Sequence, residues 1–160
     1  MKKVGKLEIT LPSDREIAMT RAFNAPRAMV FHAWTTPELV RRWMGAFAGW
    51  TMPVCDIDLR VGGTYRFLWR NTDTEMEMGM GGVYREIVVP ERIVATEKYD
   101  DAWYEGDAVV AVTLTEEDGR TTLVETVTYA SKEVRDAVLQ SPMETGVAAG
   151  FDRLEEILAS

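Results

Sequence analysis

The chain has 160 residues, of which 46% are hydrophobic and 28% are charged, a composition that suits one folded domain and excludes a disordered chain. Its formal net charge is -8 and it contains no polybasic segment, so we expect no nucleic-acid partner and no anionic membrane surface as a partner. No apolar run approaches the ~20 residues that cross a bilayer, which excludes membrane insertion by a helix.

The chain opens with a strand pattern. Apolar and polar residues alternate over 7–11, and after an interruption at Pro12 and Ser13 an extended pattern resumes and continues to Phe23. We expect one strand here, bent at the interruption.

Two short helices are predicted next. Asn24 is expected to cap the first, which ends near residue 35, and Pro26 lies just inside it. Thr36 is expected to cap the second, with Pro37 at its first position and Gly45 as a left-handed C-cap.

From residue 52 to residue 129 the apolar pattern changes to a period of about two, which is typical of strands. Turn signals rich in Gly, Pro, Asn and Asp divide this region. The connections are short, so we expect an antiparallel meander. The predicted strands cover residues 52–60, 64–70, 79–88, 92–99, 107–115 and 121–129.

Two helices end the chain. Ser131 is expected to start a brief helix that runs to residue 139, and Ser141, Pro142 and Glu144 together resemble a capping box that starts a longer one. The longer helix has one continuous apolar stripe, which needs an apolar surface to lie on. We therefore expect an α+β fold in one domain over residues 1–160, with a curved antiparallel sheet of six or seven strands around this helix. The stripe consists of Val147, Phe151, Leu154 and Leu158.

Short motifs occur in a fixed order along nearly the whole chain. They include Asp14–Ile17, Phe23–Pro26, Val30–Thr35, Asp58–Gly63, Gly82–Ile87, Pro90–Ile93 and Asp152–Leu154. In this order they resemble the Aha-type branch of the SRPBCC superfamily. The resemblance implies a START-like, helix-grip fold with an internal cavity, as in lipid-transfer domains, polyketide cyclases, the birch-pollen allergen and heat-shock ATPase activators. It does not imply a single function.

Aromatic residues mark one face of the predicted strand 64–70. Tyr65, Phe67 and Trp69 alternate with polar positions, so all three side chains should point toward the C-terminal helix. Such residues either fill a core or line a ligand cavity.

Two acidic residues interrupt apolar strand faces. Glu97 is in phase with Ile93 and Ala95, and Glu125 is in phase with Leu123 and with Tyr129 further along. Each carboxylate either faces inward or lies at a bulge or edge that leaves it in water. An inward, unpaired carboxylate would have a raised pKa and could act as a general acid or base.

The C-terminal helix contains Gly146 and Gly150 one turn apart, and each costs ~1 kcal/mol of helix stability relative to Ala. Two explanations remain open. The glycines allow close approach to the sheet, or they leave room for a ligand.

No cofactor or metal is predicted. His32 is expected at the surface, and one His and one Cys far apart in sequence do not form a zinc site or a nucleophile pair. Cys55 has no partner for an internal disulfide, and the N-terminal residues lack the apolar segment of a secretory signal, so we expect a cytoplasmic protein.

Three functions remain in competition. The preferred one is binding of a small apolar or amphipathic molecule inside the fold, at the residues named above. The second is a cavity enzyme of the polyketide cyclase or dehydratase type, in which Glu97, Glu125, Tyr65 or Tyr129 would transfer protons. The third follows from the resemblance alone and is binding of a chaperone. We expect no chaperone partner, because the N-terminal domain of the eukaryotic activators is missing. Members of this superfamily occur as monomers and as homodimers, and both remain open.

Overall fold

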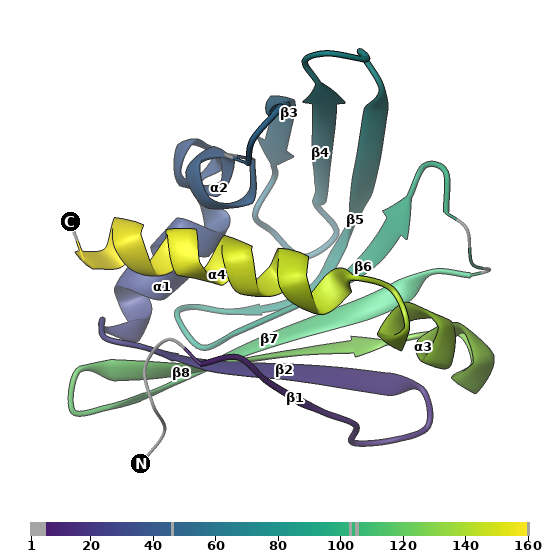
Figure 1. Cartoon of the computed structure of the whole chain (residues 1–160). Helices are drawn as coiled ribbons and strands as arrows, with labels where there is room; N and C mark the ends of the chain where they lie inside the picture. The colour runs from purple at the N-terminus through teal and green to yellow at the C-terminus, as the bar shows by residue number, and fades with distance from the viewer. Residues whose placement is uncertain (1–5, 46, 103, 105, 160) are drawn as a thin grey trace.

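The computed structural model describes residues 6–45, 47–102, 104 and 106–159. All strands belong to one antiparallel sheet in the order β1-β2-β8-β7-β6-β5-β4-β3, and α4 lies across its concave side (Figure 1). The elements are β1 (Glu8–Thr10), β2 (Glu16–Phe23), α1 (Arg27–Thr35), α2 (Pro37–Met44), β3 (Trp50–Ile57), β4 (Thr64–Asn71), β5 (Glu77–Val88), β6 (Arg92–Tyr99), β7 (Ala108–Glu117), β8 (Arg120–Thr128), α3 (Lys132–Leu139) and α4 (Met143–Ala159).

The sheet confirms the predicted meander from β3 to β8 and adds one strand. β1 and β2 pair as a hairpin, with Ile9 opposite Met19, where the sequence suggested one bent strand. The turn that contains Pro12 reverses the chain instead of bending it. The sheet therefore has eight strands.

Pairing of β2 with β8 joins the start of the chain to its last strand. The ladder runs from Glu16 opposite Thr128 to Phe23 opposite Thr121. In Figure 1, β3, β4 and β5 rise steeply from the arm formed by β1, β2 and β8, so the sheet encloses the side on which α4 lies.

The N-terminus of α1 is capped differently from the prediction. Asn24 is exposed, and Pro26 occupies the N-cap position without a side-chain hydrogen bond. Instead, the backbone N–H of Arg27 donates to Oε1 of Glu116 at 2.8 Å. A carboxylate is favourable at the positive end of a helix, so β7 supplies a cap that local sequence could not reveal.

Helix α2 begins with Pro37 as predicted. The prediction of a left-handed C-cap is wrong, because Gly45 has φ -105°. A Cβ atom at this position would lie 2.8 Å from Cβ of Met52. Glycine is needed here because β3 approaches the end of the helix closely.

The junction between α3 and α4 confirms one predicted cap and corrects the other. The hydroxyl oxygen of Ser131 accepts from the N–H of Val134 at 3.2 Å. The hydroxyl of Ser141 donates back to the carbonyl of Val138, so it closes α3 and does not form the predicted capping box of α4.

Helix α4 is attached to the sheet by charge as well as by its apolar stripe. Phe151 and Leu154 are buried, as expected. Arg21 of β2 is 1% exposed and contacts Asp152 at 2.8 Å and Glu155 at 3.0 Å. None of the described helices is long and apolar enough to cross a membrane.

The core is divided into two hydrophobic clusters. The larger one joins α1, α2, β3, β4, β5 and the C-terminal half of α4, around Trp43, Phe67 and Phe151. The smaller one joins β2, β8, the start of β7 and α3. Val110 and Val147 are only half-buried and pack against both. The smaller cluster contains Ile17, Met19, Ala108, Val127, Tyr129 and Val138.

Candidate functional site

Two carboxyl groups lie on the inner face of the sheet near the boundary between the clusters. Glu97 of β6 is paired with Ala108 of β7. Glu125 of β8 is paired with Val112 on one side and with Met19 on the other. These partners are buried core residues, and residues paired across a sheet point to the same face. Both glutamates therefore point inward.

The interior makes ionisation of both groups unfavourable. Burial raises the pKa of Glu97 to about 7. Burial, followed by the charge of Glu97, raises the pKa of Glu125 to about 8. Neither carboxyl group forms a hydrogen bond or an ion pair with another described residue, yet both side chains keep part of their surface accessible. Within the part of the chain that the structure describes, the two carboxyl groups therefore have no partner of opposite charge.

Four tyrosine side chains lie near enough to Glu97 for its charge to affect their pKa values. Burial and then the charge of Glu97 raise the pKa of Tyr65, Tyr99 and Tyr129 well above the ordinary value, and that of Tyr104 to about 12. The rings of Tyr104 and Tyr129 meet edge to face, with centroids 5.9 Å apart. All four phenols are neutral at physiological pH and supply hydroxyl groups and aromatic faces to this region.

Tyr65 reaches the site across a glycine. Its hydroxyl, on β4, donates to the carbonyl of Thr96 on β6 at 2.7 Å, and its strand partner on the intervening β5 is Gly82. A Cβ atom on Gly82 would lie 1.8 Å from that carbonyl oxygen. Glycine is therefore required for the close approach that places the Tyr65 ring beside Glu97.

All three residues of the predicted aromatic trio are buried in the larger cluster. The ring centroids of Tyr65 and Phe67 lie 5.2 Å apart, and the Trp69 indole N–H donates to the carbonyl of Met44 at 3.1 Å. Tyr65 alone of the three also bonds to β6, the strand of Glu97. The structure brings Tyr65 together with Glu97, Glu125 and Tyr129, which were predicted from separate strands.

The helix glycines do not make the predicted close approach to the sheet. Gly146 is exposed, and a Cβ atom there would meet no atom within 4 Å. Gly150 is buried, and its nearest neighbour is the carbonyl oxygen of Trp43 on α2, 3.7 Å from such a Cβ atom. Both positions have room for a methyl group, and the neighbour of Gly150 belongs to α2 and not to a strand.

Two residues of the site were not among the predicted site residues. Tyr99 follows Glu97 by two positions on β6, so the strand period alone could have identified it. Tyr104 lies between β6 and β7, where no periodic pattern exists, so only the fold reveals it.

Residues with metal-binding or nucleophilic side chains lie elsewhere. His32 is exposed, and its Nδ1 lies 3.1 Å from Oγ1 of Thr36. Cys55 is buried, and burial raises the pKa of its thiol to about 11. Among the described residues, no cluster of three or more His, Cys, Asp or Glu side chains could hold a metal ion.

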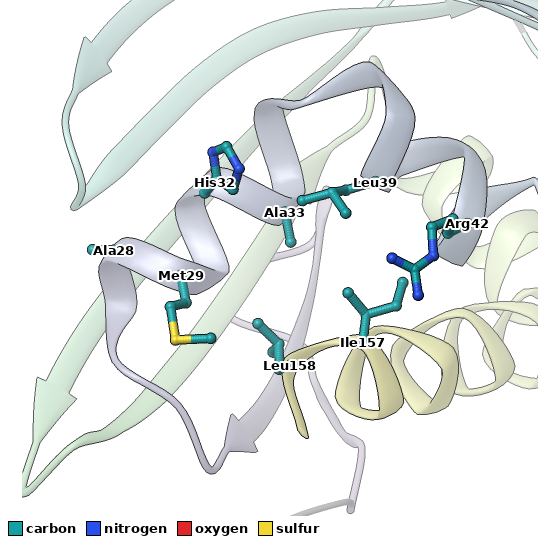
Figure 2. Close-up of a pocket in the computed structure, with 8 residues that line it drawn as sticks. All are labelled: Ala28, Met29, His32, Ala33, Leu39, Arg42, Ile157 and Leu158. Atoms are coloured by element: carbon teal, nitrogen blue, oxygen red, sulfur yellow. The ribbon is translucent and has the colours of Figure 1, made fainter. Parts of the chain in front are cut away.

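A separate hollow of about 440 Å³ lies outside the fold interior, between α1, α2 and the end of α4. Figure 2 shows Met29, Leu39 and Ile157 pointing into it, while the His32 ring points away from α4. None of the predicted ligand-binding residues lines it. Its apolar walls and open form distinguish it from the carboxyl and tyrosine region.

Several solved structures are similar to this chain over nearly its whole length. A structure from Rhodobacter sphaeroides is 30% identical, with 96% of this chain and 97% of that chain covered and a TM-score of 0.89. One from Chromobacterium violaceum is 25% identical, with 92% and 99% covered and a TM-score of 0.77. One from Mycobacterium smegmatis, at 20% identity, covers 96% and 98% with a TM-score of 0.83 and shares the fold.

A search of curated proteins found no match. The sequence model of the family described as "Activator of Hsp90 ATPase homolog 1-like protein" matches residues 24–159. That span includes both short helices, β3 to β8 and α4. The family model covers most of the chain, and the α+β helix-grip fold is that of the similar solved structures. The chain therefore belongs to the family of Activator of Hsp90 ATPase homolog 1-like proteins.

Proposed function

We propose that the protein binds a small apolar or amphipathic molecule in the interior between the sheet and α4, beside Glu97 and Glu125. The observation that carries this proposal is the state of the two carboxyl groups. Both are desolvated and inward-facing, both retain accessible surface, and neither has a hydrogen-bond or ion-pair partner among residues 6–45, 47–102, 104 and 106–159. A polar group is seldom left in this state unless water or a ligand satisfies it.

Half-buried apolar residues beside the pair support the same proposal. Val110 and Val147 contact both core clusters without being fully covered. Small-molecule sites commonly combine such apolar walls with a few polar groups that fix orientation. We infer that the ligand would contact these valines with its apolar part.

Native mass spectrometry of gently purified protein, together with titration by the neutral fluorescent probe N-phenyl-1-naphthylamine, tests this function. We expect retained mass or micromolar probe binding. Val147→Phe should reduce probe affinity at least tenfold, because the larger ring fills the interior. Thr145→Phe is the matched control, since Thr145 is exposed on the same helix. A probe affinity weaker than millimolar, with no retained mass, would refute the proposal.

Proton transfer on a bound substrate is a second candidate, favoured by the raised pKa values of Glu97 and Glu125. A general acid or base works best when its pKa lies near the working pH. Side-chain carboxyl carbon signals followed by NMR should titrate above pH 6 for both residues. Titration near the ordinary glutamate value would remove the basis for catalysis by these groups.

A further inference from the structure

We propose that the molecule bound between the sheet and α4 is an amphipathic organic cation, whose protonated amine lies between Glu97 and Glu125. This inference rests on the proposed function and specifies its ligand class. It follows from which charges the interior contains and from which partners each element can offer them.

The cationic side chains around the interior already have other partners. Arg21 of β2 is held by Asp152 and Glu155 of α4. Arg153 of α4 donates to the carbonyl of Trp43 at 3.0 Å. Arg135 of α3 donates to the carbonyl of Ser13 at 2.7 Å and to Asp136. These hydrogen bonds and ion pairs all join the three arginines to residues other than Glu97 and Glu125.

The cationic side chains on the neighbouring strands also pair with other residues. Arg66 of β4 pairs with Asp100, and Lys98 of β6 lies 3.9 Å from Asp107 and is exposed. Burial raises the pKa of Glu97, and burial followed by the like charge of Glu97 raises the pKa of Glu125. Among the described residues, neither carboxyl group pairs with a cation. A positive charge brought by a ligand would stabilise both ionised carboxylates at once.

The tyrosines make the region more selective for a cation than for a neutral polar group. Tyr65, Tyr99, Tyr104 and Tyr129 all interact electrostatically with Glu97. Aromatic faces attract ammonium groups, and the attraction is stronger in a desolvated site than in water. An anionic ligand would face the two carboxyl groups without any compensating cation and should be rejected.

Three probes that share one ring system and differ in charge test the inference: 1-naphthylmethylamine, 1-naphthylmethanol and 1-naphthoate. Calorimetric titration at pH 7.5 should show the ammonium probe binding at least tenfold tighter than the alcohol, with no measurable binding of 1-naphthoate. Between pH 6 and pH 8 the affinity of the amine should rise, because binding requires ionised carboxylates, while that of the alcohol should not.

Glu97→Gln and Glu125→Gln should each reduce the preference for the amine over the alcohol several-fold, and the double variant should abolish it. Glu117→Gln and Glu133→Gln change the net charge equally at exposed positions and should leave the preference intact. Thermal unfolding at pH 8 verifies that the variants fold, since loss of an uncompensated carboxylate should not lower stability.

The outcomes separate the two proposals. Equal affinity of the amine and the alcohol, tighter binding of 1-naphthoate, or a preference that survives in the double variant overturns the inference alone. Failure of N-phenyl-1-naphthylamine and of all three naphthyl probes to bind overturns the proposed function as well. Tighter alcohol binding at low pH would indicate that protonated carboxyl groups donate to a neutral ligand, and it would also overturn the inference.

Discussion

At the scale of single residues, Glu97 and Glu125 lower the stability of the protein whenever they are ionised. Each has a pKa in the folded chain above that of an exposed glutamate, about 7 and about 8. The folded state therefore holds protons that the unfolded state releases between about pH 4.5 and pH 8. In this window, stability falls as pH rises.

This linkage predicts a stability maximum at about pH 4. Above that pH the unfolded chain releases the two glutamate protons while the folded chain keeps them, so stability falls as pH rises. Below it the lowered pKa values of Asp100, paired with Arg66, and Asp136, paired with Lys132 and Arg135, reverse the trend. Urea unfolding from about pH 3 to about pH 9 measures the curve.

The double variant Glu97→Gln/Glu125→Gln is the control for this assignment. It should flatten the fall between pH 5 and pH 8 and should leave the acid side unchanged. A wild-type curve that is level over this range would show that both glutamates have ordinary pKa values in the folded protein.

The alternation of residues along β6 and β8 identified Glu97 and Glu125 as candidates for inward positions. The sequence could not decide between an inward carboxylate and one at a bulge or edge. That decision depends on the partners across the sheet, Ala108 for Glu97 and Val112 for Glu125. Strand register is a property of several segments together, and one segment does not encode it.

At the scale of elements, α4 is held by an ion cluster that is asymmetric in burial. Arg21 is 1% exposed, whereas Asp152 is 65% exposed. Removing the arginine leaves Asp152 in water and Glu155 only partly buried, but removing both carboxylates leaves a buried guanidinium without a counter-charge. The second change is the more costly one.

We expect Asp152→Ala/Glu155→Ala to destabilise the protein by ~3 kcal/mol, because Arg21 then stays buried without a counter-charge. This loss should exceed that of Arg21→Met. Urea unfolding of both variants at pH 7 gives the comparison. A larger loss for Arg21→Met would mean that packing of the arginine stem, and not its charge, holds the helix.

Two glycine-to-alanine substitutions should have opposite effects. Gly146→Ala should stabilise α4 by ~0.5–1 kcal/mol, because helix propensity improves and no atom lies within 4 Å of the new Cβ. Gly82→Ala should destabilise β5 strongly, because its Cβ would overlap the Thr96 carbonyl and displace Tyr65. Thermal unfolding ranks the two variants, and similar midpoints would contradict both assignments.

The predicted elements agree with the structure better than the predicted ends of the helices do. Hydrophobic periodicity reports on burial along one segment, so β4, β6 and α3 lie almost where the sequence placed them. Caps depend on what folds against the end. Glu116 caps α1 from β7, and Gly45 is small because of Met52. Neither contact is local in sequence.

At the scale of the whole molecule, the core is divided, and most of its aromatic packing lies in the larger cluster. The larger cluster contains edge and tilted ring contacts, such as Phe23 with Phe151 at 5.8 Å and Trp34 with Trp43 at 4.8 Å. Phe151→Ala should therefore cost ~3–5 kcal/mol. Because Glu97 and Glu125 lie near the boundary between the clusters, replacing them should disturb the larger cluster little.

The packing of Leu7, Val110 and Val147 against both clusters has a consequence for cooperativity. The smaller cluster lies at the start of β2, the end of β8 and α3, whereas Phe23 and Leu123 at the other ends of these strands belong to the larger cluster. The start of β2, the end of β8 and α3 should therefore open locally before global unfolding. Hydrogen exchange should show weaker amide protection there than in β4 and β5. A molecule lodged beside the valines would join the two units, and the ligand would then act as a missing part of the core that makes unfolding more concerted.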